Sequence, residues 1–282
     1  HGIPDALIDN HSSKKGYAIW GFSDFFRYSE GQIIHNGLEV EESPLILLQN
    51  LINLWQDDDI PITCVGFLSY DIKNIFYPHI KFKPLKGEFP YIWFAKPKII
   101  KSYALNSSNI IKDKKILSIN RDFLDFYKYE KKILKIKDEL KVGNTYQINF
   151  TMNKLFETKL SSFETYLAIR EKAKPAFGYY LNIGEEQILS FSPEEFFHTK
   201  GKTIKTYPMK GTTKIGKTKT EDNNLKQDLK NSAKNQAEHI MIVDLLRNDL
   251  GKICKYGSVK VEDLFKINSY ETVHQMVSCV YG

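Results

Sequence analysis

Cysteine is scarce in this 282-residue chain, and the shortage excludes several classes of protein. Cys64, Cys254 and Cys279 are an odd number without metal-binding spacing, so we expect neither structural disulfides nor a cysteine-based metal site. No apolar run approaches the ~18 residues of a membrane-spanning helix. The start also lacks the basic segment and apolar core of a signal peptide. The sequence therefore predicts a protein of the reducing cytoplasm that makes no membrane contact.

Arginine is also rare, because only four of the 40 basic residues are arginine, namely Arg27, Arg121, Arg170 and Arg247. Arg247 stands in a Leu-Arg-Asn-Asp run, where a planar, bidentate donor is one interpretation. The interpretation we favour is structural, with the guanidinium tying Asp244 or Asn248 into the fold.

Positive charge is spread along the chain. The net charge is +6, and in a Lys-rich stretch from residue 96 to 141 apolar residues at helical spacing leave lysines on a solvated face. The lysines alternate with acidic residues and no recognition motif is present, so we expect no nucleic-acid partner. A mild positive field favours an anionic small substrate instead.

The hydrophobic pattern switches between helical and strand periods. It predicts helices over residues 44–56, 128–141 and 161–174, and one long helix over 222–250 that stops at Gly251. β-forming residues predict strands over 62–70, 91–105 and 146–157. Helices interspersed with hairpin-joined strands indicate an α+β or mixed class.

The most distinctive pattern places an acid and an amine on one predicted hairpin. Residues 190–198 and 203–209 are rich in β-formers, and the intervening Lys200-Gly201 is a turn signal. Pro193 and Pro208 indicate that the strands bend or end near Glu194 and Lys210, because proline removes a ladder donor. If the two strands pair without interruption from the turn onward, which we call simple pairing, Glu194 lies opposite residue 207 or 208. The alternative is an ordinary salt bridge between surface residues.

Five ordered blocks carry a family resemblance. They are GNTYQINF at 143–150, SPEEFF at 192–197, PMKGT at 208–212, AEHIMIVDLLRNDLG at 237–251 and VHQMVS at 273–278. Together they resemble the chorismate-utilising enzymes, and most closely the subfamily of aminodeoxychorismate synthase component I. The resemblance implies a two-sheet β sandwich flanked by helices, with chorismate bound between the halves.

The resemblance assigns chemistry to three residues. Lys210 matches a lysine that attacks ring carbon C2 of chorismate, where anthranilate synthases usually carry alanine. The 4-hydroxyl then leaves, and ammonia adds at C4 while the lysine is expelled. Glu194 is the general acid, and burial beside Phe191 and Phe196 would raise its pKa in the required direction. Gln147 stands where water-adding enzymes carry a lysine base, and an amide takes no proton at neutral pH.

Further residues follow from the same resemblance. Gly211 and Thr212 offer backbone amides to a substrate carboxylate, and the alternative is a plain turn. Glu238 matches a Mg²⁺ ligand, and the alternative is a helix-surface pair with Lys234. His274 matches a residue that contacts the departing or attacking group, and the alternative is a structural histidine.

The chain also departs from this family. Asn235 replaces an acidic residue that assists the metal, and residues 213–216 lack the Arg-x-Arg-Gly run of relatives. The sequence stops at Gly282, where relatives continue with further substrate and Mg²⁺ ligands. We therefore expect one chorismate-binding domain over 1–282, incomplete at its C-terminus. It would comprise an N-terminal part, 1–125, and the start of the catalytic region, 126–282.

The leading hypothesis is amination of chorismate to 4-amino-4-deoxychorismate on the route to p-aminobenzoate and folate. No cysteine-based glutaminase motif is present, so ammonia would come from a separate glutamine amidotransferase subunit. The alternatives are anthranilate synthase component I and a non-catalytic binding module of the same family.

Overall fold

The computed structural model describes residues 2–57, 59–82, 89–105, 117–122 and 125–282, without the side chains of 119–122. The chain divides into two compact units, one formed by His1–Asn106 with Ala173–Gly282 and the other by Ser107–Lys172. The single domain expected over 1–282, with its boundary at residue 125, stays a prediction.

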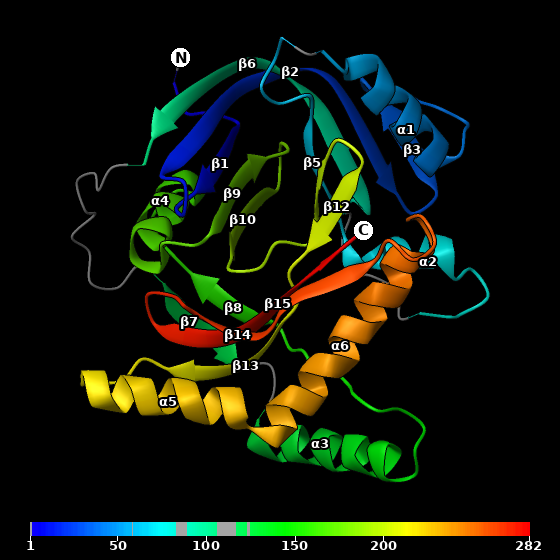
Figure 1. Ribbon diagram of the computed structural model, residues 1–282. Helices are drawn as coiled ribbons and strands as arrows, with labels where there is room; N and C mark the ends of the chain where they lie inside the picture. The colour runs from blue at the N-terminus through cyan, green and yellow to red at the C-terminus, as the bar shows by residue number, and fades with distance from the viewer. Residues whose placement is uncertain (1, 58, 83–88, 106–116, 123–124) are drawn as a thin grey trace. The chain divides into compact units, whose positions relative to one another are not determined.

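The larger unit contains an eight-stranded antiparallel sheet, ordered β10-β9-β1-β2-β3-β4, in which β6 pairs with both β2 and β5. Its strands are β1 (Ala6–Asn10), β2 (Lys15–Ser29), β3 (Gln32–His35), β4 (Leu38–Glu39), β5 (Val65–Leu68), β6 (Ile92–Ala104), β9 (Phe177–Asn182) and β10 (Gln187–Ser192). Figure 1 shows β2 and β6 running side by side along their length. The strands predicted over 62–70 and 91–105 are confirmed as β5 and β6.

Helix α1 (Pro44–Trp55) packs one apolar face into the core of this sheet. Pro44 stands at the helix start, where its missing N–H costs nothing. Leu47, Leu51 and Trp55 recur at four-residue steps and are buried with Phe26 of β2. The Trp55 indole donates to Asp24 at 2.9 Å, which satisfies the polar atom of that buried ring. A short turn of helix, η1 (Tyr70–Ile72) and α2 (Lys73–Phe76), follows β5.

The same unit contains a five-stranded antiparallel sheet centred on β15 (Val273–Tyr281). One edge of β15 pairs with β14 (Lys260–Ser269), and the other pairs with β12 (Thr203–Thr206) and then β13 (Met209–Lys214). Strand β11 (His198–Lys200) pairs with β12. Helices α5 (Lys219–Asn231) and α6 (Ala233–Gly251) both contact β13, β14 and β15.

The long helix predicted over 222–250 is wrong, because the chain turns sharply at Ser232 between α5 and α6 (Figure 1). Ser232 is extended, with φ −68° and ψ 108°, and its hydroxyl accepts hydrogen bonds from the backbone N–H and side-chain amide of Asn235. Serine is a favoured N-cap, so the sequence does contain a signal for this break. Apolar residues at four-residue steps continue across Ser232, and they predicted one continuous helix instead. The buried residues of α6 are His239, Val243 and Leu250, whereas Met241 and Leu245, two of the apolar residues at four-residue steps that favoured one long helix, are exposed.

The smaller unit contains β7 (Ser118–Asp122), α3 (Phe126–Lys141), β8 (Lys154–Glu157) and α4 (Ser162–Ala173). Strands β7 and β8 pair antiparallel. The helices predicted over 128–141 and 161–174 are confirmed, but the strand predicted over 146–157 is limited to β8. Residues 146–153 join no ladder, and Tyr146, Ile148 and Met152 are exposed, so their β-forming side chains have no buried surface to cover.

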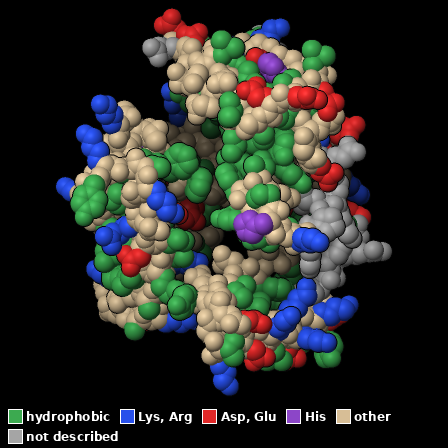
Figure 2. Space-filling view, turned by 90° about the vertical axis from the view of Figure 1, so that its right-hand side faces the viewer, with side chains coloured by type: hydrophobic (Ala, Val, Ile, Leu, Met, Phe, Trp, Pro, Cys, Tyr) green, Lys and Arg blue, Asp and Glu red, His purple; other side chains and the backbone are tan. Residues whose placement is uncertain are grey.

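The fold class is α+β, with two large antiparallel sheets accompanied by helices, and that prediction is confirmed. Within the described residues, none of the helices combines the length and apolar character needed to cross a membrane. On the face shown in Figure 2, Lys and Arg side chains are scattered among Asp and Glu.

The break at Ser232 generates a stability prediction. Ser232→Ala removes the acceptor for both Asn235 groups, so the free energy of unfolding in urea titrations should fall by about 1 kcal/mol. Ser232→Asp retains an N-cap acceptor and should stay close to the wild type. Equal stability of the alanine variant and the wild type would show that the cap does not hold this break.

Candidate active site

The predicted hairpin exists, but it is shorter than the sequence indicated. His198 pairs with Lys205 and Lys200 with Thr203, so Gly201-Lys202 form the turn, with Gly201 at φ +58°. Strand β10 ends at Ser192 and residues 193–197 leave the ladder, as Pro193 indicated. Glu194 therefore pairs with neither residue 207 nor 208, and the simple pairing is wrong.

Glu194 nevertheless meets the Met209-Lys210 segment. The Ser192 hydroxyl bonds to both the N–H (3.1 Å) and the C=O (2.9 Å) of Glu194 and so fixes this turn. Partial desolvation raises the pKa of the Glu194 carboxyl, opposed by a hydrogen bond from the Met209 N–H and by the charge of Lys210. The predicted burial against Phe196 is wrong, because that ring is 79% exposed. The acid and the amine singled out in the sequence are thus brought together.

A β-bulge follows Lys210. Lys210 pairs with Met276 and Thr212 with Gln275, so Gly211 is the additional residue, at φ +74°. A Cβ at position 211 would lie 3.0 Å from Leu229 and 3.1–3.2 Å from Asn235, so the α5–α6 corner also requires a small residue here. The positive φ and the close packing explain why position 211 is a glycine. The substrate-binding roles of Gly211 and Thr212 stay predictions.

The strand register places Lys210 and His274 on one face of the sheet. Lys210 lies opposite Met276, and side chains two residues apart on a strand share a face. His274 is therefore a diagonal neighbour of Lys210 on the face that includes Met276.

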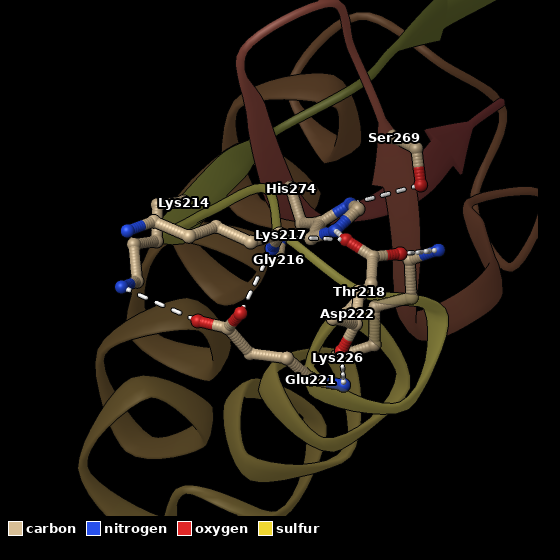
Figure 3. Close-up of polar contacts among 9 residues, drawn as sticks. All are labelled: Lys214, Gly216, Lys217, Thr218, Glu221, Asp222, Lys226, Ser269 and His274. Atoms are coloured by element: carbon tan, nitrogen blue, oxygen red, sulfur yellow. Dashed lines mark hydrogen bonds and ion pairs between the residues drawn. The ribbon is translucent and has the colours of Figure 1, made fainter.

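His274 is enclosed by hydrogen-bonding partners (Figure 3). Its side chain is 1% exposed. Its Nδ1 lies 2.9 Å from the Ser269 Oγ, and its Nε2 lies 2.7 Å from Asp222 Oδ1. Ser269 pairs directly with His274 across the β14–β15 ladder, whereas Asp222 comes from the first turn of α5.

Sequence reasoning missed Asp222. Its carboxylate is held by Lys226 Nζ at 2.7 Å, by the Gly216 N–H at 2.9 Å and by His274. These contacts, led by Lys226, keep its pKa well below the usual range for aspartate. The signal that could have found it is the Thr218-x-x-Glu221 capping box, in which the Thr218 hydroxyl accepts the Glu221 N–H and marks the start of α5.

The loop before α5 is fitted closely to Asp222. A Cβ on Gly216 would lie 2.2 Å from the Asp222 backbone nitrogen, so only glycine allows this approach. Glu221 reinforces the loop by accepting the Lys217 N–H at 2.8 Å and by pairing with Lys214 at 3.5 Å (Figure 3). The loop around Gly216, in which the Arg-x-Arg-Gly run of relatives is missing, thus helps to hold Asp222 against His274.

Glu238 lies on α6, with Lys234 Nζ 4.0 Å from its carboxylate and 40% of its side chain exposed. In the part of the chain that the structure describes, no three His, Cys, Asp or Glu side chains form a metal cluster. Mg²⁺ is commonly held by one or two protein carboxylates with water and substrate oxygens. The pair between Glu238 and Lys234 that the sequence also allowed is present, and a role for Glu238 as a Mg²⁺ ligand stays a prediction.

Two other predicted residues have defined places. Arg247 Nη1 lies 3.0 Å from Asp244 Oδ1, which is the contact favoured for it, and because both side chains are more than half exposed its structural role stays a prediction. Gln147 belongs to the smaller unit, in the irregular segment between α3 and β8, and its backbone oxygen accepts the Thr145 hydroxyl. Its place in a substrate site stays a prediction.

A cavity of about 570 Å³ lies on the other face of the β13–β15 ladder from Lys210. Met209 and its partner Val277 line it, and side chains alternate between the two faces along a strand. Pro193 and Glu195 line it as well, but Glu194 and Lys210 are not among its lining residues.

Comparison with known proteins supplies the family context. The chorismate binding enzyme family matches residues 4–282. Anthranilate synthase component 1 of Saccharolobus solfataricus is 29% identical over 274 residues, covering 91% of this chain and 65% of that protein. Aminodeoxychorismate synthase component 1 of Bacillus subtilis is 36% identical over 154 residues, covering 55% of this chain and 33% of that protein.

The fold has a close counterpart among solved structures. Anthranilate synthase component I of Streptococcus pneumoniae superposes with a TM-score of 0.77 at 18% identity, covering 95% of this chain and 68% of that chain. The chain spans about two-thirds or less of the length of the two curated relatives. Because the family match extends over nearly all of its residues, the chain belongs to the chorismate binding enzyme family.

Proposed function

We propose that this protein is the chorismate-aminating component of an aminodeoxychorismate synthase, which forms 4-amino-4-deoxychorismate for p-aminobenzoate and folate synthesis. The observation that carries the proposal is the placement of Glu194 against the Met209-Lys210 segment, where the charge of Lys210 acts on its carboxyl. Relatives with both aminodeoxychorismate synthase and anthranilate synthase names resemble the chain, so the side chain at position 210 decides between them.

The proposed chemistry divides between the acid and the amine. Hydroxide is a poor leaving group, so the loss of the 4-hydroxyl requires a proton, and Glu194 donates it. The raised pKa of Glu194 supports this role, because more of the carboxyl then stays protonated. Lys210 attacks C2 of the ring as the hydroxyl leaves, and ammonia later adds at C4 and expels the lysine.

Chorismate carries two carboxylates that the site has to accommodate. Backbone N–H groups at the Gly211 bulge and the hydroxyl of Thr212 are the proposed donors to one of them. Glu238 would hold Mg²⁺, which when bound neutralises negative charge on the substrate. Gln147 stands where water-adding relatives carry a lysine base, and its amide cannot act as a base, which supports amination rather than hydration.

The partner that we propose is a glutamine amidotransferase subunit that supplies ammonia. Support comes from the names of the relatives, which are first components of synthases.

The second candidate function is that of anthranilate synthase component I. It is favoured by the Saccharolobus solfataricus relative, which matches 91% of the chain, and by the Streptococcus pneumoniae structure. Lys210 argues against it, since the resemblance places alanine there in anthranilate synthases.

The test is a mass-resolved turnover assay on the full-length protein with chorismate, Mg²⁺ and ammonium. Aminodeoxychorismate as the product would support the proposal, whereas anthranilate would favour the second candidate. Unchanged chorismate in the presence of a binding signal would favour a non-catalytic binding module.

Lys210→Ala should lower chorismate amination by roughly 10³-fold, as the removal of a single catalytic group often does. The matched control is Lys202→Ala, at an exposed lysine in the β11–β12 turn. We expect that control to retain wild-type turnover. An alanine variant at 210 that aminates at the wild-type rate would refute the covalent mechanism.

Glu238→Gln should raise the Mg²⁺ concentration needed for half-maximal activity by roughly 10-fold or more, because an amide is a weaker ligand than a carboxylate for a hard cation. The measurement is a magnesium titration of turnover at fixed chorismate. Lys234→Gln, which removes only the ion pair at 4.0 Å, is the control and should leave the titration near that of the wild type. Superimposable titrations for Glu238→Gln and wild type would exclude Glu238 as a ligand.

A further inference from the structure

The imidazole of His274 has no ring nitrogen left for a substrate. Both nitrogens already contact protein groups, Ser269 Oγ at 2.9 Å and Asp222 Oδ1 at 2.7 Å, and the side chain is almost completely buried. Ser269, in contrast, is exposed at the end of β14. Direct contact between His274 and a reacting group is therefore blocked, and Ser269 is the member of this chain of contacts that a substrate can reach.

The hydrogen-bond partners determine which nitrogen of His274 carries the proton. Asp222 accepts from the Gly216 N–H and from the Lys226 ammonium, so it is present as a carboxylate with only acceptor atoms. The Nε2 of His274 must then be protonated and donate to Asp222. In the neutral ring Nδ1 is left with its lone pair, which accepts the hydroxyl proton of Ser269.

We propose that Ser269, His274 and Asp222 form a proton relay that removes the proton from ammonia as it adds to the ring. Ser269 is the catalytic group that touches the incoming nitrogen, and Asp222 is a positioning residue that acts through His274. This inference rests on the proposed function and concerns its second half-reaction, after Lys210 has formed its adduct.

The ammonia lone pair forms the C4–N bond, both ring double bonds shift, and the C2–N bond of the protonated lysine adduct breaks, so that Lys210 leaves as a neutral amine. The new ammonium group passes one proton to Ser269 Oγ, and the hydroxyl proton of Ser269 moves to Nδ1 of His274. The resulting imidazolium is stabilised by the Asp222 carboxylate, and it loses its proton to solvent before the next turnover.

The position of the relay agrees with this role. His274 and Lys210 are diagonal neighbours on one face of the β13–β15 ladder, with Cα atoms roughly 7–8 Å apart in such a pairing. The charged groups near the ring are Asp222 and Lys226 on α5, with the Lys214–Glu221 pair at the start of that helix (Figure 3). Glu194 supplies a proton to the first half-reaction and the relay removes one in the second, so acid and base are separate groups.

The decisive experiment separates the two half-reactions in the full-length protein. Without ammonia, intact-mass spectrometry follows the adduct of chorismate on Lys210; ammonium is then added and the decay of the adduct to product is timed. Ser269→Ala should form the adduct at the wild-type rate but aminate it about 10²-fold more slowly.

Each outcome is decisive. Amination of the adduct at the wild-type rate in Ser269→Ala would overturn the relay, and so would an equal loss in both half-reactions, which indicates a structural role. A wild-type protein that forms neither adduct nor product would reject the proposed function itself, and the relay with it.

The positioning role of Asp222 has a readout that does not depend on turnover. In ¹⁵N-detected NMR spectra of the wild type, with His274 assigned from a His274→Gln spectrum, the neutral ring should be protonated on Nε2. Asp222→Asn should change that tautomer and slow amination, whereas Asp228→Asn, at an exposed aspartate of the same helix, should change neither. An unchanged tautomer and amination rate in Asp222→Asn would remove Asp222 from the relay.

Discussion

The pairing of β15 with its neighbours is the constraint on which the proposed active site depends. β12 and β13 occupy one edge of this strand and β14 the other, and Met276 and Val280 within it are fully buried. A one-residue slip of β13 against β15 would move Lys210 to the opposite face from His274. The bulge at Gly211, which packs closely against Leu229 and Asn235, opposes such a slip because it fits only one position under the helices. The pairing of this sheet therefore maintains the relation between Lys210 and His274.

The corner between α5 and α6 determines which charged groups lie next to His274. Because the chain turns at Ser232, α5 can contact the sheet separately from α6 and bring Asp222 to His274. Gly211 and Gly216 make the approach possible, since a Cβ on either would meet the helices at 3.0 Å or less. The same packing leaves two carboxyl groups with opposite shifts in pKa, raised at Glu194 by desolvation and lowered at Asp222 chiefly by Lys226. Opposite shifts suit one group to donate a proton and the other to stabilise a cation.

The sequence predicted correctly those helices and strands that depend on local patterns of residues. The helices over 44–56 and 128–141 and the strand over 91–105 follow from periodic apolar residues and end signals, and the structure contains them. The strand over 146–153 and the helix across Ser232 failed, because propensity cannot tell whether a partner strand or a buried surface is present. Glu194 and Lys210 were recognised by their motifs, but their simple pairing across the hairpin was wrong because residues 193–197 leave the ladder.

The sequence by itself determined the family and the α+β class and singled out Glu194 and Lys210, since these inferences depend on residue types in ordered blocks. Only the tertiary structure decided that His274 is enclosed, that Asp222 from α5 holds one side of it and that Ser269 from β14 holds the other. Asp222 lies 52 positions from His274 in the chain, and such contacts depend on helix packing and strand register rather than on local pattern. Hydrogen bonding acts between atoms close in space, so a role set by partners becomes visible only once the chain is folded.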